Sequence, residues 1–123
     1  LVANHQAAGV IVSSATVSTA YMYSGGGPVL YPTLDVFAIM PMFSHSSSTR
    51  PLILPADDEL ELKYEHNEKA KVILDGHNEF DLDSGDSLKI KNSSTRYKLI
   101  HPSDYDYFDA CRSKLYWGLP IVK

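Results

Sequence analysis

The sequence is poor in cysteine, since Cys111 is the one thiol among its 123 residues. A single cysteine cannot close an intrachain disulfide, and it cannot build a cysteine-based zinc cage. Proteins without disulfides are typical of reducing compartments. We therefore expect a cytoplasmic protein.

Long apolar runs and an excess of positive charge are also missing. No hydrophobic stretch approaches the roughly 20 residues that a membrane-spanning helix requires, so we expect no membrane partner. Lysine and arginine number 11 against 15 acidic residues, which gives a formal net charge of −4. Non-specific binding to a nucleic-acid backbone needs a positive field, so we expect no nucleic-acid partner either.

The motifs of several enzyme classes are absent as well. The glycines at 25–27 are not followed by Gly-Lys-Ser/Thr, so they form no P-loop. No G-x-S-x-G is present, which argues against a serine hydrolase. The five histidines form no pair at metal-ligand spacing, and the acid clusters at 57–61 and 81–86 are typical of solvated turns. We expect no metal site in this chain.

What is present is the composition of a globular protein. Hydrophobic residues make up 44% of the chain and charged residues 21%, which predicts one domain spanning residues 1–123. The chain begins with Leu1 and carries no secretion signal. We therefore expect a piece of a longer protein.

Apolar runs and strict alternation of apolar and polar residues predict a mainly β fold. Asp75-Gly76 is a strong hairpin dipeptide between two of the expected strands. The expected strands are Val10–Val12, Asp35–Met42, Pro51–Pro55, Leu60–Glu65, Val72–Leu74, His77–Leu82, Leu88–Lys91 and Tyr97–Ile100.

Two short helices complete the expected fold. The first runs from about Thr19 to Ser24 and is stopped by three glycines and Pro28. The second covers Ser103–Leu115, with Ser103 as N-cap, acidic residues in the first turn and basic residues in the last. Gly118 and Pro120 are expected to end it.

The hydroxyl-rich segment Ser13–Thr19, before the first helix, has two interpretations. Serine and threonine side chains cap helices by accepting hydrogen bonds from free backbone N–H groups. The same turn, closed by glycines, is able to cradle a phosphate or another anion. Both interpretations stay open from the sequence alone.

Several separated segments of the chain match the motifs of one known family. Residues 9–28 follow the pattern D-G-L-I-x-S-T-P-T-G-S-T-A-Y-x-x-S-x-G-G-P, with Ser18-Thr19-Ala20-Tyr21 and Gly26-Gly27-Pro28 intact. The further matches are Pro41-Met42-Phe43-Ser44-His45 with Arg50-Pro51-Leu52, Leu74-Asp75-Gly76, and Leu99-Ile100-His101-Pro102-Ser103-Asp104-Tyr105-Asp106-Tyr107-Phe108 with Arg112-Ser113-Lys114-Leu115. Together these segments resemble the C-terminal part of the NAD kinase family.

The resemblance implies a function and an architecture. Members of this family use ATP or polyphosphate, with Mg²⁺, to phosphorylate the adenosine ribose 2′-hydroxyl of NAD. Their C-terminal domain is β-sandwich-like, NAD lies between it and an N-terminal α/β domain, and the C-terminal part forms homo-oligomers. The implied partners are therefore a small-molecule dinucleotide and further copies of the chain, as a dimer or tetramer.

The resemblance also implies which residues contact the dinucleotide. Asp75 and His77 are implied as contacts because they lie in or beside the matched strand-turn motif. His77 would approach the ligand across a subunit contact. The full implied set is Thr19, Ala20, Tyr21, Ser24, His77, Gln6, Ala8 and Asp75.

The chain departs from the family pattern at several of these positions. Ala8 replaces an aspartate, Ala15 a proline and Val17 a glycine, while Gln6 lies near a basic position and Tyr116 replaces a glycine. A β-branched residue does not readily adopt positive φ angles, so a positive φ at Val17 would require a loop unlike the family's.

The catalytic G-G-D-G motif of the family does not occur here. We therefore expect an NAD-binding and oligomerisation part of an NAD kinase that has no catalytic residue and is inactive alone. A degenerate, non-catalytic nucleotide-binding or assembly module of the same fold is the main alternative. A related lipid kinase is a third and weaker one, because those enzymes lack the S-T-A-Y and L-I-H-P-x-D-Y combination.

Overall fold

The computed structural model describes residues 1–46 and 49–118. The described residues fall into two compact units, which meet between Asn92 and Ser93 in the sequence. Pro120, expected to end the last helix, lies outside the described residues. No helix among those described is long and apolar enough to cross a bilayer. The structure contains seven described strands and two helices, which confirms the predicted mainly β fold.

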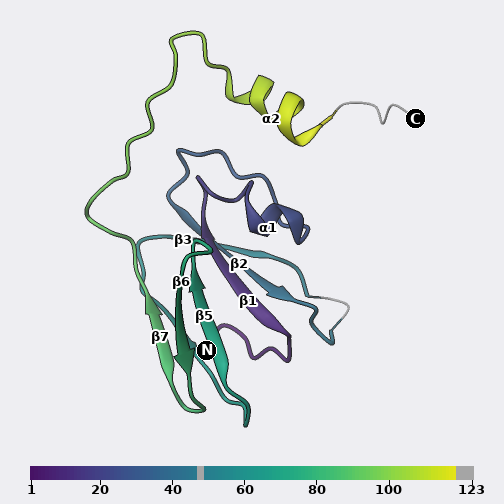
Figure 1. Cartoon of the computed structure of the whole chain (residues 1–123), viewed down its shortest axis with the longest axis vertical. Coiled ribbons are helices and arrows are strands. Elements are labelled where there is room, and N and C mark those ends of the chain that lie inside the picture. Colours follow the sequence, from purple (N-terminus) through teal and green to yellow (C-terminus); the bar gives the residue numbers. More distant parts are fainter. Residues whose placement is uncertain (47–48, 119–123) are drawn as a thin grey trace. The chain divides into compact units, whose positions relative to one another are not determined.

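The first unit is built around a three-stranded antiparallel sheet in the order β1-β2-β3 (Figure 1). Its strands are β1 (Gly9–Ser14), β2 (Val36–Met42) and β3 (Leu52–Pro55). The central strand β2 was expected to be buried because it is almost wholly apolar, and Phe37, Ala38 and Met40 are indeed buried.

A short helix, α1 (Tyr21–Ser24), packs against one face of this sheet. Met22 of this helix is only 1% exposed. Its side chain packs in a core of buried residues from β2 and from the segments on either side of the helix. The remaining members of this core are Ala15, Leu30, Ala38 and Met40.

The other strands of the first unit form two antiparallel pairs. β4 (Leu60–Lys63) pairs with β7 (Ser87–Ile90), and both alternate between half-buried and exposed residues as the sequence predicts. Between them in the chain, β5 (Ala70–Leu74) and β6 (Asn78–Leu82) form a hairpin.

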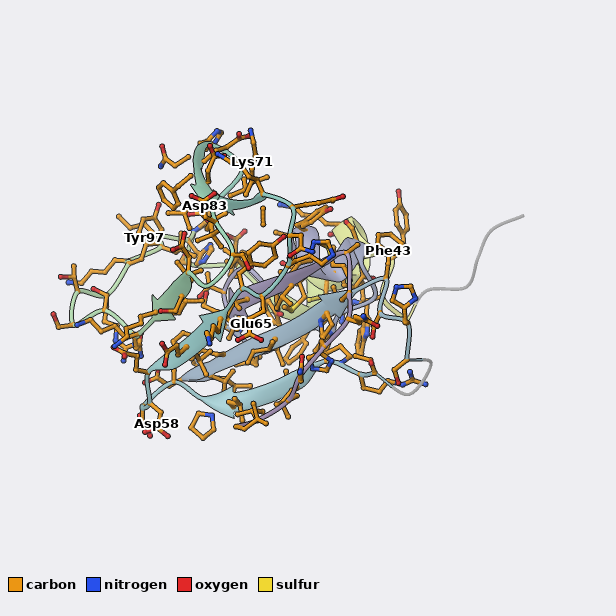
Figure 2. All side chains as sticks on the ribbon, turned by 90° about the horizontal axis from the view of Figure 1, so that it is seen from below. Phe43, Asp58, Glu65, Lys71, Asp83 and Tyr97 are labelled. Carbon is orange, nitrogen blue, oxygen red and sulfur yellow. The ribbon has the colours of Figure 1, made fainter. Side chains whose placement is uncertain are left out.

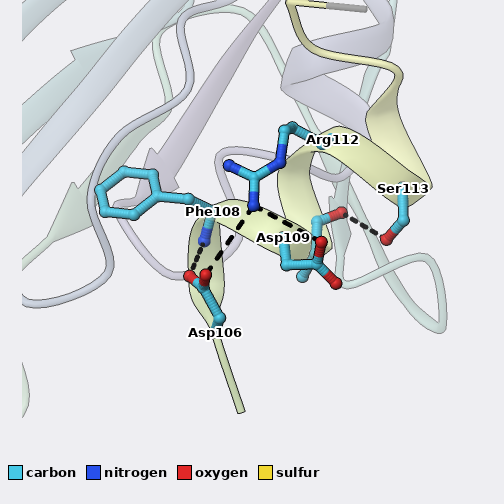
Figure 3. Close-up of polar contacts among 6 residues, drawn as sticks. Asp106, Phe108, Asp109, Arg112 and Ser113 are labelled. Atoms are coloured by element: carbon cyan, nitrogen blue, oxygen red, sulfur yellow. Dashed lines mark hydrogen bonds and ion pairs between the residues drawn. The ribbon is translucent and has the colours of Figure 1, made fainter.

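The second unit contains the helix α2 (Tyr107–Leu115). Figure 3 shows that the carboxylate of Asp106 accepts a hydrogen bond from the backbone N–H of Phe108 over 2.8 Å and lies 3.8 Å from the guanidinium of Arg112. Asp106 is therefore the N-cap, and the prediction that Ser103 caps the helix was wrong. The backbone N–H of Tyr105 bonds instead to the carbonyl of Pro102, and this turn delays the helix to Tyr107.

The expected last strand, Tyr97–Ile100, does not form. Within the described part of the chain, residues 91–100 contain no strand. Tyr97 is 87% and Ile100 97% exposed, so the apolar residues of this segment face no buried surface. The prediction was wrong because apolar residues alone do not supply the neighbouring strand with which a β-strand must pair.

Candidate functional site

The candidate site begins with α1, whose two sides differ. Met22 is buried beneath the helix, whereas Ala20, Tyr21 and Ser24 are exposed and Thr19 is half-buried. Tyr21 keeps 69% of its surface accessible. The core contact therefore fixes the helix while its polar and aromatic residues are available to a ligand.

The hydroxyl-rich segment does not cap α1. The N-cap is Ala20, which has no side-chain cap, and its backbone N–H bonds to the carbonyl of Val17 over 3.1 Å. The capping interpretation was therefore wrong for this helix. Ser18 serves another purpose: it is fully buried, and its Oγ accepts a hydrogen bond from the backbone N–H of Leu30 over 3.0 Å.

The backbone at Val17 shows how the chain accommodates the loss of the family's glycine. Among the described residues, the non-glycine positions with positive φ are Phe43, Asp75 and Tyr116. Val17 is not one of them, and its side chain is 46% exposed. A β-branched residue fits this position without left-handed strain.

Gln6 and Ala8 lie beside the end of β2. The backbone N–H of Ala8 bonds to the carbonyl of Met42 over 2.9 Å, and the carbonyl of Gln6 accepts from the N–H of His45 over 3.2 Å. Both residues are exposed. Ala8 has no functional group beyond its methyl, so it offers no acid to a ligand at this position.

A hollow of about 320 Å³ lies between the glycines after α1 and the segment around β2 and β3. Arg50 is the charged residue among those that line it, and one of its guanidinium nitrogens also donates to the carbonyl of Thr49 over 3.2 Å. The lining residues are Gly25, Gly26, Met40, Pro41, Thr49, Arg50 and Pro51.

Asp75 and His77 lie on a separate element, the turn between β5 and β6. The N–H of His77 bonds to the carbonyl of Leu74 over 3.0 Å, and Asp75 and Gly76 both adopt positive φ, at 50° and 75°. Both predicted site residues are exposed at the tip of this hairpin. Their position is therefore set by the turn, and not by α1 or the main sheet.

Two surface ion pairs shift pKa values, one at the end of β4 and one between β5 and β6. A hydrogen bond from the ammonium of Lys63, 2.7 Å away, lowers the pKa of Glu65, and the same contact raises the pKa of Lys63. The carboxylate of Glu79 likewise raises the pKa of Lys71. All four side chains are well exposed, so these pairs are surface features.

Within residues 1–46 and 49–118, no three histidine, cysteine, aspartate or glutamate side chains gather closely enough to hold a metal ion.

The structure adds three residues to those expected from the sequence: Ser18, Phe43 and Arg50. The sequence showed no sign of Ser18's buried bond, because its partner Leu30 is 12 positions away. Phe43 was detectable as a large aromatic residue in a polar loop directly after an apolar strand. Arg50 was detectable as the single lysine or arginine between residues 1 and 62.

Comparison with known proteins identifies relatives along the whole chain. Residues 1–102 match the sequence model of the ATP-NAD kinase C-terminal domain. An NAD kinase of Cellvibrio japonicus is 41% identical over 99% of this chain, and one of Pseudoalteromonas translucida is 45% identical over 89%. The chain spans only about two fifths of these relatives, 41% and 38% of their respective lengths.

Two solved structures are similar in fold. Yeast NADH kinase complexed with NADH aligns over 97% of this chain with a TM-score of 0.80 and 25% identity. An NAD kinase from Archaeoglobus fulgidus in complex with ATP aligns over 76% of it with a TM-score of 0.68 and 29% identity. The chain covers 38% and 35% of those two chains.

Proposed function

Because the chain belongs to the NAD kinase family and corresponds to its C-terminal domain, we propose that it is the dinucleotide-binding part of an NAD kinase. The whole protein would transfer the γ-phosphoryl group of ATP, or a phosphoryl group of polyphosphate, to the 2′-hydroxyl of the adenosine ribose of NAD. The 2′-oxygen would form the new bond to phosphorus, and the bond to the donor's bridging oxygen would break. NADP would be the product.

The observation that carries this proposal is the arrangement of α1. Met22 holds the helix to the sheet, while Tyr21 and Ser24 remain accessible and Thr19 is half-buried. These are the residues that the family resemblance assigns to NAD contacts. A hydroxyl pair and an exposed ring suit the hydrogen-bonding and flat faces of a nucleotide.

The hollow beside the helix supports the same function. Its Arg50 brings positive charge next to the backbone of Gly25 and Gly26. A guanidinium group suits the oxygens of a diphosphate, which a dinucleotide carries between its two riboses. The role that we propose for the residues of α1 and for Arg50 is to bind and orient the dinucleotide.

Catalysis is proposed to lie outside these residues. Phosphoryl transfer requires positioned phosphates and a group that accepts the proton of the attacking hydroxyl. The G-G-D-G segment to which the family resemblance assigns that role does not occur in the 123 residues. We therefore propose that this chain alone is inactive. We also propose, from the family resemblance, that it forms homo-oligomers of two or four copies and that the whole protein is cytoplasmic.

Calorimetric titration of the chain with NAD tests the binding role, with NADP as the comparison ligand. Measurable heat that is reduced in Tyr21→Ala is expected. Thr33→Ala is the matched control, because Thr33 is exposed and belongs to no helix or strand. Absence of binding at millimolar NAD would contradict the proposal that this chain binds the dinucleotide on its own.

A degenerate, non-catalytic module of the same fold is the second candidate, and the changes at Ala8, Ala15 and Val17 favour it. The triple variant Ala8→Asp, Ala15→Pro, Val17→Gly separates the two. Tighter NAD binding by this variant supports a dinucleotide site that is weakened but intact. An unchanged, undetectable affinity supports the assembly module.

A further inference from the structure

Phe43 has an unusual backbone for its residue type. It directly follows β2 with a φ of 49°, in the left-handed region that bulky side chains rarely adopt. Its side chain is nevertheless 89% exposed. A large aromatic group is thus held in water at a position where glycine or asparagine would fit more easily.

Hydrogen bonds on both sides hold Phe43 in this conformation. The carbonyl of Met42 accepts from the N–H of Ala8 over 2.9 Å, and the N–H of His45 donates to the carbonyl of Gln6 over 3.2 Å. Beyond them, the hydroxyls of Ser44 and Thr49 lie 3.1 Å apart and close the following loop. Uncommon backbone angles persist where the surroundings over-determine them, and such positions cluster at ligand sites.

The neighbours of Phe43 belong to the candidate site. Gln6 and Ala8, which hold its flanks, are both in the set implied for dinucleotide contacts. Pro41, two residues earlier, lines the hollow with Gly25 and Gly26. Figure 2 shows Phe43 at one end of the three-stranded sheet, with Asp58 at the opposite end.

We propose that Phe43 is a stacking platform for one of the two heteroaromatic rings of the bound dinucleotide. The inference rests on the proposed function and adds a ligand-contacting residue to it. An exposed phenyl ring stacks on any flat heteroaromatic face, and the fixed backbone reduces the ordering that binding requires. A contact with another protein surface is the competing role, and the flanking bonds to Gln6 and Ala8, both in the implied set of dinucleotide contacts, favour the ring.

The test is titration of the 123-residue chain and its variants with NAD. Phe43→Leu removes the aromatic face, and we expect NAD to bind about tenfold more weakly, as is usual for loss of one base-stacking aromatic. Phe43→Tyr should bind within about twofold of the unchanged chain. Phe80→Leu is the matched control, because Phe80 is a 48% exposed phenylalanine on β6.

A second variant protects the test against misfolding. Glycine adopts a positive φ without strain, so Phe43→Gly should fold at least as stably and should lose as much affinity as Phe43→Leu. Adenosine monophosphate and nicotinamide mononucleotide then distinguish the two rings. The ring that stacks on Phe43 is the one whose mononucleotide loses affinity in Phe43→Leu.

Three outcomes would overturn the proposal. Unchanged NAD affinity in both Phe43→Leu and Phe43→Gly, with a loss in Tyr21→Ala, would reject the platform and leave the proposed function standing. The same unchanged affinity together with weakened self-association in sedimentation would assign Phe43 to a protein contact. Absence of NAD binding by the unchanged chain would reject the proposed function, and the platform with it.

Discussion

The Oγ of Ser18 accepts a hydrogen bond from the backbone N–H of Leu30, 3.0 Å away, and this bond joins the two ends of the segment that carries α1. Ser18 is completely buried and Leu30 is 9% exposed. The bond therefore acts in a low-dielectric interior, where a lost partner is costly.

Replacement of Ser18 by alanine should destabilise the chain by about 1–3 kcal/mol, because a buried N–H loses its acceptor and the core gains no packing. Urea denaturation measures this difference. Ser14→Ala is the matched control, since Ser14 is exposed and its change should stay within about 0.5 kcal/mol. Equal effects from the two variants would contradict a structural role for Ser18.

Replacement of Gly27 by alanine should also destabilise the chain. An added Cβ would lie 2.8 Å from the carbonyl oxygen of Met22 and would also collide with that residue's side chain. Crowding against backbone is not relieved by a rotamer change, so we expect a loss of about 1–3 kcal/mol in thermal or urea unfolding. Thr33→Ala serves as the control, and a Gly27→Ala chain as stable as the control would refute the close packing.

Asp106→Ala should loosen the start of α2. The variant loses the bond that caps Phe108 at 2.8 Å, which is worth about 1 kcal/mol, or about fivefold in the opening equilibrium. Hydrogen exchange at Ala110, whose N–H bonds to the carbonyl of Asp106 over 3.1 Å, should be faster by that factor. Ser103→Ala should leave exchange unchanged, and the reverse result would restore Ser103 as the cap.

The Lys63–Glu65 contact predicts a pH dependence with a defined sign. The nearby ammonium lowers the pKa of Glu65 in the folded chain. The stabilisation from this ion pair is therefore fully present above the usual carboxyl pKa, and it is lost as the pH falls through the lowered pKa of Glu65. Lys63→Met should raise the pKa of Glu65 toward its ordinary value in an NMR titration. Lys71→Met, which breaks the Lys71–Glu79 pair, should not move it.

Much of the fold followed from local patterns. The alternation at Leu60–Glu65 and Leu88–Lys91 located β4 and β7, and Asp75-Gly76 located the β5–β6 turn, because a positive φ at both positions needs such residues. The helix starts were less accurate. Ser103 and Asp106 are both good caps, and only the turn from Pro102 to Tyr105 decides between them.

The candidate site was less accessible to sequence reasoning. Local signals predicted a helix from Thr19, which begins at Tyr21, and the resemblance implied its dinucleotide contacts. The accessibility of these residues depends on the burial of Met22 in a core with Ala38 and Met40, which are far away in the chain. The positive φ of Phe43 and the bond from Leu30 to Ser18 are likewise tertiary features. No local pattern in one sequence encodes them.

The nesting of the β5–β6 hairpin inside the β4–β7 pair has a consequence for the order of folding. β4 and β7 are joined by a long connection, whereas β5 and β6 are joined by a tight turn. Closing the short loop first costs less chain entropy, and it shortens the effective loop that must then be closed between β4 and β7. We therefore expect the hairpin to form first in this half of the unit, and we expect a slower turn at Asp75-Gly76 to delay the pairing of β4 with β7 as well.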